Sequence, residues 1–259
     1  MDETIKALFA QQRRLGGLHL SMQVSQGHGP LTLTGLHGLW YRLWSPFETE
    51  AEHKALVKSF SLIPWHQEGH SFLTATRVEI GERFRFDVLS WDEIMIDQFA
   101  VIADSWPKQN VVVGSTKFVG EEAVLDAPRT VAELLDALLP SSRLRIGIHS
   151  PLSFRRVGLQ YPLPEPELTL NSLAKRWLVR QEDQHAEIFR RLHIRRYELR
   201  TEPADFRQYK IIGAMGFMEL GLQELTEVER SLVTALFKLG EYSGVGYGTT
   251  HGLGHIVVR

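Results

Sequence analysis

The order in which strand-like and helix-like patterns follow one another is the feature that most constrains the fold of this chain. Leu18–Val24 alternates apolar and polar residues, and residues 34–45 then carry apolar side chains at helical spacing. Two strand-like stretches around Gly81, a helix with Asp92 as its cap, and one or two strands within Asn110–Leu125 complete the first half. This half therefore predicts a ferredoxin-like unit, whose order is strand–helix–strand–strand–helix–strand.

The second half of the chain repeats this order. The expected elements are a strand, a helix, two strands, a helix and a strand, at Arg143–His149, from about Leu168 to Trp177, Arg195–Thr201, Tyr209–Leu220, Thr226–Leu239 and Ile256–Arg259. Thr226 and Glu229 have the spacing of a capping box. The sequence thus predicts an α+β fold of two tandem ferredoxin-like (RRM-like) domains, at residues 1–126 and 143–259.

Two further local expectations concern the middle of the first half. Residues 48–60 are expected to form a second helical stretch. Phe72–Glu79 and Glu82–Trp91 are expected to pair as strands around Gly81.

Composition excludes several kinds of chemistry. The chain has no cysteine, which excludes disulfides, thiolate nucleophiles, cysteine zinc sites and iron–sulfur clusters. No apolar run approaches the ~20 residues that span a bilayer, and the first residues lack a signal pattern. We therefore expect a cytoplasmic protein with no membrane partner.

Charge is distributed unevenly along the chain. Residues 1–142 hold 12 basic and 18 acidic residues, whereas residues 143–259 hold 17 basic and 13 acidic ones, which gives −6 and +4 and a total of −2. A phosphate is affected only by charges within about a Debye length, ~8–10 Å, so local charge density matters more than the net charge. The basic residues of the second half form a run that suits phosphate contact. This run consists of Arg143, Arg145, Arg155, Arg156, Lys175, Arg176, Arg180, Arg190, Arg191, Arg195, Arg196 and Arg200.

The segment Gly240–His255 is the richest in glycine, with six glycines in sixteen residues. Such a segment can fold as a tightly packed hairpin, or its free N–H groups can form an anion-binding nest. It does not fit G-x-G-x-x-G, because Thr249 and His251 stand where a glycine is needed, and it has no lysine for a Walker loop. We expect no nucleotide cofactor.

This glycine-rich segment, preceded by Leu239, resembles the C-terminal signature of the CRISPR repeat endoribonucleases, which are members of the RAMP superfamily. Three other segments resemble parts of that family: Ser150–Arg156, Tyr161–Leu168 running on to Leu173–Trp177, and Ile212–Glu219. The resemblance implies two ferredoxin-like domains, binding of CRISPR precursor RNA and cleavage within each repeat. It also implies a metal-independent reaction that leaves a 5′-hydroxyl and a 2′,3′-cyclic phosphate, with the Gly-rich loop against the RNA.

Metal-free RNA cleavage by the ribose 2′-OH needs a base, an acid and donors to the phosphate, and histidine suits the proton steps. His37 is our first candidate, because it stands near the start of the first helix, where the resembled family often has a catalytic histidine. Tyr41 lies four residues on and shares its helical face. His53 and Lys54 follow in the next helical stretch and could reach the same site. Each of these side chains could instead be structural.

The remaining candidates are expected to bind RNA. They are Arg155, Arg156, Gly246, Gly248, His251, Gly252 and Gly254. His255, at the end of the glycine-rich segment, could also contact RNA. No metal site is expected. The pair His66 and His70 has zincin-like spacing, but its glutamate stands one place late, and Pro64 and Gly69 oppose a helix.

Three functions stay open at this point. The first is a repeat endoribonuclease. The second is a non-catalytic RAMP subunit that holds guide RNA, with other subunits of a CRISPR effector complex as partners. The third is an unrelated small-molecule or metal-dependent enzyme on the same scaffold. His37 favours the first, and the sequence leaves both a monomer and a homodimer open.

Overall fold

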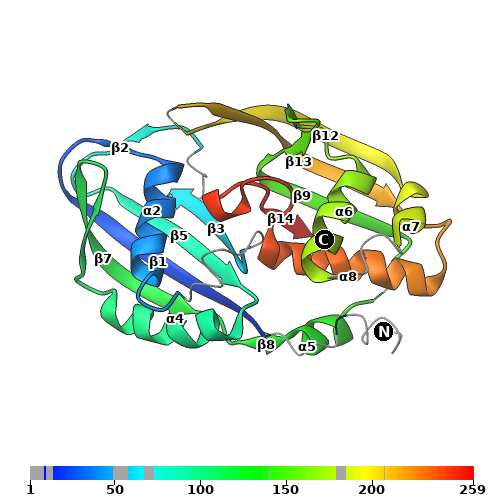
Figure 1. Ribbon diagram of the computed structural model, residues 1–259, viewed down its shortest axis with the longest axis horizontal. Coiled ribbons are helices and arrows are strands. Elements are labelled where there is room, and N and C mark those ends of the chain that lie inside the picture. Colours follow the sequence, from blue (N-terminus) through cyan, green and yellow to red (C-terminus); the bar gives the residue numbers. More distant parts are fainter. Residues whose placement is uncertain are drawn as a thin grey trace.

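A computed structural model gives the fold of the chain, and it describes residues 9, 14–48, 58–66, 73–139, 141–178, 185–206 and 208–259. The described residues form two antiparallel sheets, one from each half of the chain, lying side by side (Figure 1). Two helices cover one face of each sheet. Every helix in these ranges is too short or too polar to cross a lipid bilayer.

The first sheet has the strand order β3-β5-β1-β7-β6. Its strands are β1 (Arg14–Gln26), β3 (Phe60–His66), β5 (Arg83–Ser90), β6 (Asn110–Val113) and β7 (Thr116–Leu125). Its helices are α2 (Leu33–Trp44) and α4 (Glu93–Ser105). The Asp92 side chain accepts a hydrogen bond from the Met95 N–H, which confirms the expected cap of α4.

The middle of the first half differs from the sequence-based expectation. Residues 49–57 of the expected helical stretch 48–60 lie outside the described residues, and residue 60 already belongs to strand β3. Strand β5 pairs with β3 and β1. Residues 73–79 contribute only the short strand β4 (Thr76–Arg77), which pairs with β2 (Pro30–Leu31). The expected pairing of Phe72–Glu79 with Glu82–Trp91 is therefore wrong. Pro64 concealed β3, yet proline is tolerated there because β3 is an edge strand.

The second sheet has the strand order β12-β13-β9-β14. Its strands are β9 (Arg143–Leu152), β12 (His193–Asp205), β13 (Lys210–Gly221) and β14 (Ile256–Val258), and its helices are α6 (Pro166–Trp177) and α8 (Glu227–Ser243). Thr226 and Glu229 form the expected capping box of α8. Smaller elements are the hairpin of β10 (Phe154–Arg156) and β11 (Leu159–Tyr161), α7 (Ala186–Arg190) and the 3₁₀ turn η2 (Thr249–His251).

Both sheets place the first and third strands of the unit in the centre, which is the arrangement of a ferredoxin-like unit. The predicted α+β class is confirmed. Short elements β8 (Arg129–Thr130) and α5 (Val131–Asp136) connect the two halves. The exact domain limits, 1–126 and 143–259, stay a prediction.

The two hydrophobic cores exchange side chains across this division. Phe206, Ile211 and Leu253 come from the second half and belong to the core of the first sheet. Leu15 and Trp91 come from the first half and belong to the core of the second sheet. The tip of the β12–β13 hairpin and the glycine-rich loop after α8 are thereby fixed against the first half, which positions the candidate site.

Candidate active site

Helix α2 presents His37 beside its first turn. The Thr32 side chain caps the helix by accepting a hydrogen bond from the Gly35 N–H, at 3.0 Å. The buried stripe of this helix contains Leu36, Leu39 and Trp40. His37 is offset from that stripe and is half-buried, so its ring reaches the second half of the chain rather than the core.

The glycine-rich loop folds back on itself and on strand β3. Gly254 has φ +67°, and a Cβ there would lie 1.9 Å from the Val245 carbonyl oxygen. Gly252 has φ +88°, and its Cβ would lie 2.6 Å from Cδ of Pro64. Only glycine meets both demands, so these residues are needed for packing.

The amides of this loop are largely engaged within the protein. Gly246 N–H donates to the Ser172 hydroxyl, and Gly254 N–H donates to the Pro151 carbonyl. Gly252 N–H donates to the Thr249 carbonyl at the end of η2. An anion-binding nest would need such donors free, which favours the packed-loop alternative. RNA contact by Gly246, Gly248, Gly252 and Gly254 stays a prediction.

This packing brings His251 against His37. The two imidazole rings are stacked, with centroids 3.7 Å apart and an interplanar angle of 13°. His37 Nδ1 lies 2.7 Å from the Thr250 carbonyl oxygen, so residues 213 positions apart form one site. The candidates His37 and His251 are therefore in direct contact.

The Thr250 contact determines the tautomer of His37. A carbonyl oxygen only accepts hydrogen bonds, so Nδ1 must carry the proton and donate it. In the neutral ring, Nε2 is then unprotonated and can take up a proton. Burial lowers the pKa of His37, the Thr250 bond opposes this shift, and the charge of Lys58 adds to it, which favours the neutral ring.

His251 is the second neutral ring of the pair. Burial, with a smaller effect from His37, lowers the pKa of His251 to about 4. Its ring also meets Phe206 edge to face, at 5.6 Å between centroids. Two stacked imidazoles disfavour a charge on each other, so both are neutral at neutral pH before an anion binds.

Tyr41 completes the cluster from the next turn of α2. Its ring centroid lies 4.7 Å from that of His37. Burial, with a smaller effect from Glu48, raises the pKa of Tyr41, so its hydroxyl keeps its proton. Lys58, which was not a sequence candidate, contributes to the lowered pKa of His37 through its positive charge. Its Nζ lies 3.5 Å from Oε1 of Glu48.

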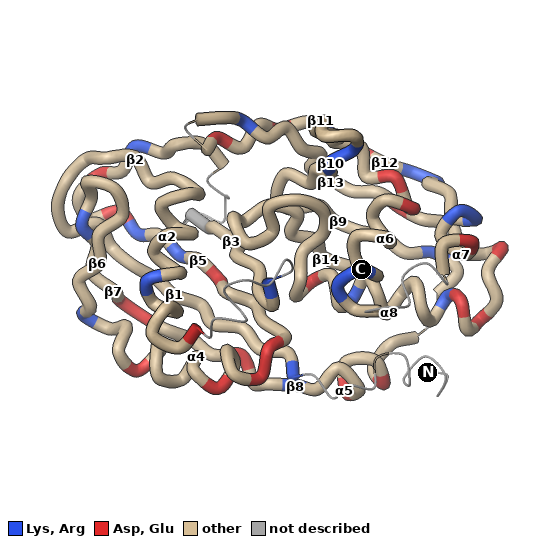
Figure 2. The backbone as a smooth tube through the Cα atoms, in the orientation of Figure 1, with Lys and Arg blue, Asp and Glu red and all other residues tan. Residues whose placement is uncertain are grey.

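Arg155 and Arg156 are exposed on the β10–β11 hairpin. The Arg155 guanidinium lies 4.1 Å from the ring centroid of Tyr247 and donates to its hydroxyl at 2.8 Å. Arg156 lies over Tyr161, at 5.6 Å from the ring centroid. Both arginines are thus available at the surface, and Figure 2 shows basic residues around β10 and β12, whereas acidic ones gather on α4.

Arg176 has a different role from the phosphate contact considered for its run. It is half-buried, and it donates to the carbonyl oxygens of Ser243, Gly244 and Gly246 at 2.7–2.9 Å. Burial lowers its pKa to about 10, so it stays charged at neutral pH. Arg176 therefore holds the start of the glycine-rich loop, a role that no local sequence pattern predicts.

The remaining sequence candidates lie elsewhere. His255 is half-buried beside His149, and burial lowers its pKa to about 4. His53, Lys54, Arg180, the His66 side chain and His70 lie outside the residues whose side chains are described. Within the described part of the chain, no three His, Asp or Glu side chains are grouped so as to hold a metal ion.

Comparison with known proteins finds one family model that is similar to the second half of the chain. Residues 146–256 match the model of a family described as CRISPR-associated endoribonuclease Cas6. No curated protein sequence matches the chain at a significant level. The resemblance to the CRISPR repeat endoribonucleases is confirmed by this match and by the solved structures described next.

Several Cas6 structures share the whole fold. A product complex of the Cas6 TTHA0078 is 26% identical with a TM-score of 0.77, over 95% of this chain and 99% of that one. Its substrate mimic complex is 25% identical with a TM-score of 0.73, over 95% and 100%. The product complex of a second Cas6, TTHB231 of Thermus thermophilus, is 20% identical with a TM-score of 0.79, over 95% and 100%, and shows the fold alone. TTHA0078 has also been solved as an H37A mutant.

Proposed function

We propose that this protein is an endoribonuclease that binds CRISPR precursor RNA and cuts it within the repeat. The observation that carries the proposal is the stack of His37 on His251 under the glycine-rich loop. The Thr250 contact leaves Nε2 of the neutral His37 ring unprotonated, and the Tyr41 ring centroid lies 4.7 Å from that of His37. The Cas6 relatives solved with a product or a substrate mimic, and as an H37A mutant, support the same reading.

In the proposed reaction, His37 acts as the general base. Its Nε2 removes the proton of the ribose 2′-OH, and the 2′-oxygen attacks the neighbouring phosphorus. The bond from phosphorus to the 5′-oxygen breaks, which leaves a 2′,3′-cyclic phosphate and a 5′-hydroxyl. The Thr250 carbonyl holds the ring in the productive tautomer and stabilises the imidazolium that forms.

Tyr41 supplies the donor that the leaving oxygen needs. Its hydroxyl stays protonated because its pKa is raised, so it can donate a hydrogen bond as negative charge develops on the 5′-oxygen. Lys58 adds positive charge near the phosphate, although its pairing with Glu48 reduces this effect. These steps use side chains of the protein alone, so we propose that cleavage is metal-independent.

The test is cleavage of labelled repeat RNA in EDTA by the unmodified protein, His37→Ala and Tyr41→Phe. We expect one cut by the unmodified protein, with a cyclic phosphate on the upstream fragment. Loss of the base should reduce the rate by a factor on the order of 10²–10⁴, and loss of the tyrosine hydroxyl should reduce it by about tenfold or more. Both variants should bind RNA as tightly as the unmodified protein.

Two outcomes would contradict the proposal. Tight binding without cleavage by the unmodified protein would favour a guide-holding RAMP subunit, and absence of binding would exclude the RNA function. Loss of cleavage in EDTA, restored by a divalent cation, would contradict metal independence. A cytoplasmic location, association with effector subunits and homodimer formation stay predictions.

A further inference from the structure

A row of aromatic side chains leads from the candidate site to the protein surface. We call the ring row the four rings of His251, Phe206, Tyr209 and Tyr247 together with the guanidinium of Arg155. His251 meets Phe206 edge to face at 5.6 Å, and Phe206 stacks on Tyr209 at 5.2 Å and 9°. Arg155 caps the ring of Tyr247 at 4.1 Å.

Tyr209 and Tyr247 join the two parts of the row. The Tyr247 hydroxyl is a neighbour of the Tyr209 hydroxyl and, with burial, raises the pKa of Tyr209, while Arg155 opposes this shift. The ring row therefore continues without interruption from the stacked histidines to an exposed arginine. None of its members except His251 and Arg155 was a sequence candidate.

Three separate segments build the ring row and hold it rigidly. Phe206 and Tyr209 stand at the tip of the β12–β13 hairpin, where the Phe206 N–H donates to the Tyr209 carbonyl. Tyr247 is fixed by its N–H, which donates to the Ser153 carbonyl at 2.8 Å. The Gln160 side chain binds the backbone of Lys210 and Ile212, and so joins the β10–β11 hairpin to the start of β13.

The ring row has one buried and one open end. Phe206 is buried in the core of the first half, whereas Tyr209 is 47% exposed and Arg155 is exposed. A tyrosine that is half-exposed at a hairpin tip contributes little to a hydrophobic core. Surface arginines are usually surrounded by water, whereas Arg155 is stacked on a ring. An exposed series of π faces with an arginine beside them suits nucleobases and the phosphates that connect them.

We propose that the ring row is a stacking platform for unpaired nucleotides of the RNA next to the cut. This inference rests on the proposed function and adds to it that the substrate is single-stranded beside the scissile phosphate. A base stacks on the exposed face of Tyr209, and Arg155 contacts the adjoining phosphate. Because the rings are already held in place, little ordering is needed on binding.

The test measures binding of a set of repeat RNAs in which one nucleotide at a time beside the cut is made abasic. For the unmodified protein, an abasic site at one or two positions should weaken binding by about tenfold, the effect of losing one stacked base. Tyr209→Leu should weaken binding of the intact RNA by a similar factor, and it should be insensitive to the same abasic sites. Tyr209→Phe should restore both properties, since it keeps the ring.

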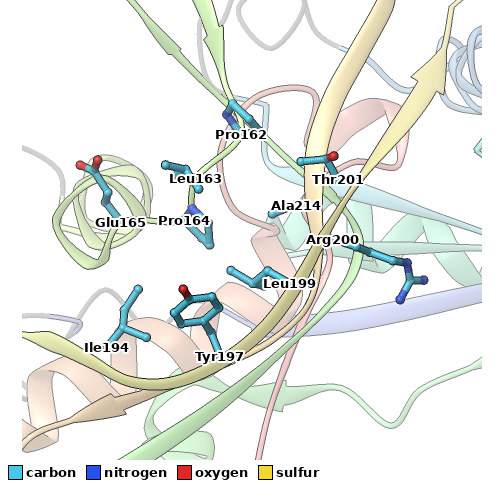
Figure 3. Close-up of a pocket in the computed structure, with 10 residues that line it drawn as sticks. All are labelled: Pro162, Leu163, Pro164, Glu165, Ile194, Tyr197, Leu199, Arg200, Thr201 and Ala214. Carbon is cyan, nitrogen blue, oxygen red and sulfur yellow. The ribbon is translucent and has the colours of Figure 1, made fainter.

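Tyr197 offers a matched control. It is an exposed tyrosine on β12, eight residues from Asp205, which is the strand partner of Lys210. At ~3.3 Å per residue it lies about 26 Å from the hairpin tip. It lines a separate hollow of about 710 Å³ between β12 and residues 162–165, together with Leu163, Pro164 and Leu199 (Figure 3). Tyr197→Leu should bind and cleave every RNA as the unmodified protein does.

The outcomes separate this inference from the proposed function. Cleavage that proceeds normally while every abasic RNA binds as well as the intact RNA would overturn the stacking platform and leave the nuclease standing. An equal effect of Tyr209→Leu and Tyr197→Leu would also overturn it. Failure of the unmodified protein to bind any repeat RNA would overturn both.

Discussion

At the scale of single residues, the site depends on two histidines that are kept neutral by burial. The stack of His251 on His37 covers one face of the His37 ring, and the Thr250 carbonyl fixes its tautomer. Both rings are thus neutral before RNA binds, unlike a histidine pair in which one ring already carries a proton on each nitrogen. The binding of a phosphate would oppose the effect of burial and make protonation easier during the reaction.

The first prediction at this scale concerns the acidic limb of the cleavage profile against pH. Since the base must be unprotonated, a lowered pKa of His37 lets cleavage continue below pH 6.5. Replacing His251 with Asn exposes the His37 ring to water, so the pKa should rise and the limb should move to higher pH. His149→Asn is the control, because His149 lies against His255 instead. An unmoved limb in His251→Asn would show that the stack does not set this pKa.

The second concerns stability and centres on His19 in β1. Its ring nitrogens lie 2.8 Å from Asp87 and 3.0 Å from Asp126, and these carboxylates raise its pKa to about 9. A folded-state pKa above the unfolded value of 6.5 means that the protonated ring stabilises the fold below pH 6.5. This contribution is lost as the pH rises through 9.

His19→Asn should therefore lower the free energy of unfolding by about 2 kcal/mol at pH 6 and by much less at pH 10. Urea unfolding at both pH values measures the difference. His28→Asn, at an exposed turn, is the control and should show little change at either pH. A loss for His19→Asn that is equal at the two pH values would mean that packing, rather than charge, is responsible.

At the scale of elements, the glycine-rich loop is a packed structural segment that places His251 against His37. Its glycines allow close backbone contacts, and Arg176 binds three of its carbonyl groups. The position of His251 therefore depends on residues outside the pair of stacked histidines. The same holds for the β12–β13 hairpin, whose tip packs on the other half of the molecule.

We expect Gly254→Ala to lower the free energy of unfolding by about 2–4 kcal/mol and to reduce cleavage sharply. The added Cβ clashes with the Val245 carbonyl at a positive φ, which displaces the turn that holds His251. Gly38→Ala is the matched control for stability. It lies inside α2 with open space around its Cβ, so it should stabilise the protein by about 0.5–1 kcal/mol. Thermal and urea unfolding of the two variants measures both changes. A Gly254→Ala protein as stable as the unmodified protein would contradict the tight packing of the loop.

At the scale of the whole molecule, the two halves are tied together by their cores. Leu253 from the end of the chain fills the first core, and Trp91 from the first half meets Trp177 of the second core at 5.2 Å. Each core therefore contains side chains from both halves. The candidate site lies at this junction, so we expect the halves and the site to assemble together.

The corresponding prediction is a single unfolding transition. Tryptophan fluorescence and far-ultraviolet circular dichroism should give coincident urea curves, because the cores cannot melt separately. Leu253→Ala should move the whole curve by about 2–4 kcal/mol and keep one transition. Two transitions, or curves that differ between the probes, would mean that the halves unfold independently.

Most elements could be predicted from the sequence, since each depends on local patterns. The α2 stripe, the Asp92 cap and the Thr226–Glu229 capping box are set by neighbours within one or two turns. Strand β3 was missed because Pro64 interrupts its local strand pattern, and its pairing with β5 shows that it is a strand. The resemblance in the second half pointed to the CRISPR repeat endoribonucleases and, through them, to His37 as a candidate.

The sequence by itself determined the order of the elements, the two ferredoxin-like units and the candidate histidine. Only the tertiary structure decided that His251 stacks on His37, that Arg176 holds a loop instead of a phosphate, and that Phe206 and Tyr209 line a path from the site. The physical reason is distance along the chain. Hydrophobic periodicity and capping act over a few residues, whereas a contact between residues 37 and 251 exists only after two cores have exchanged side chains across the molecule.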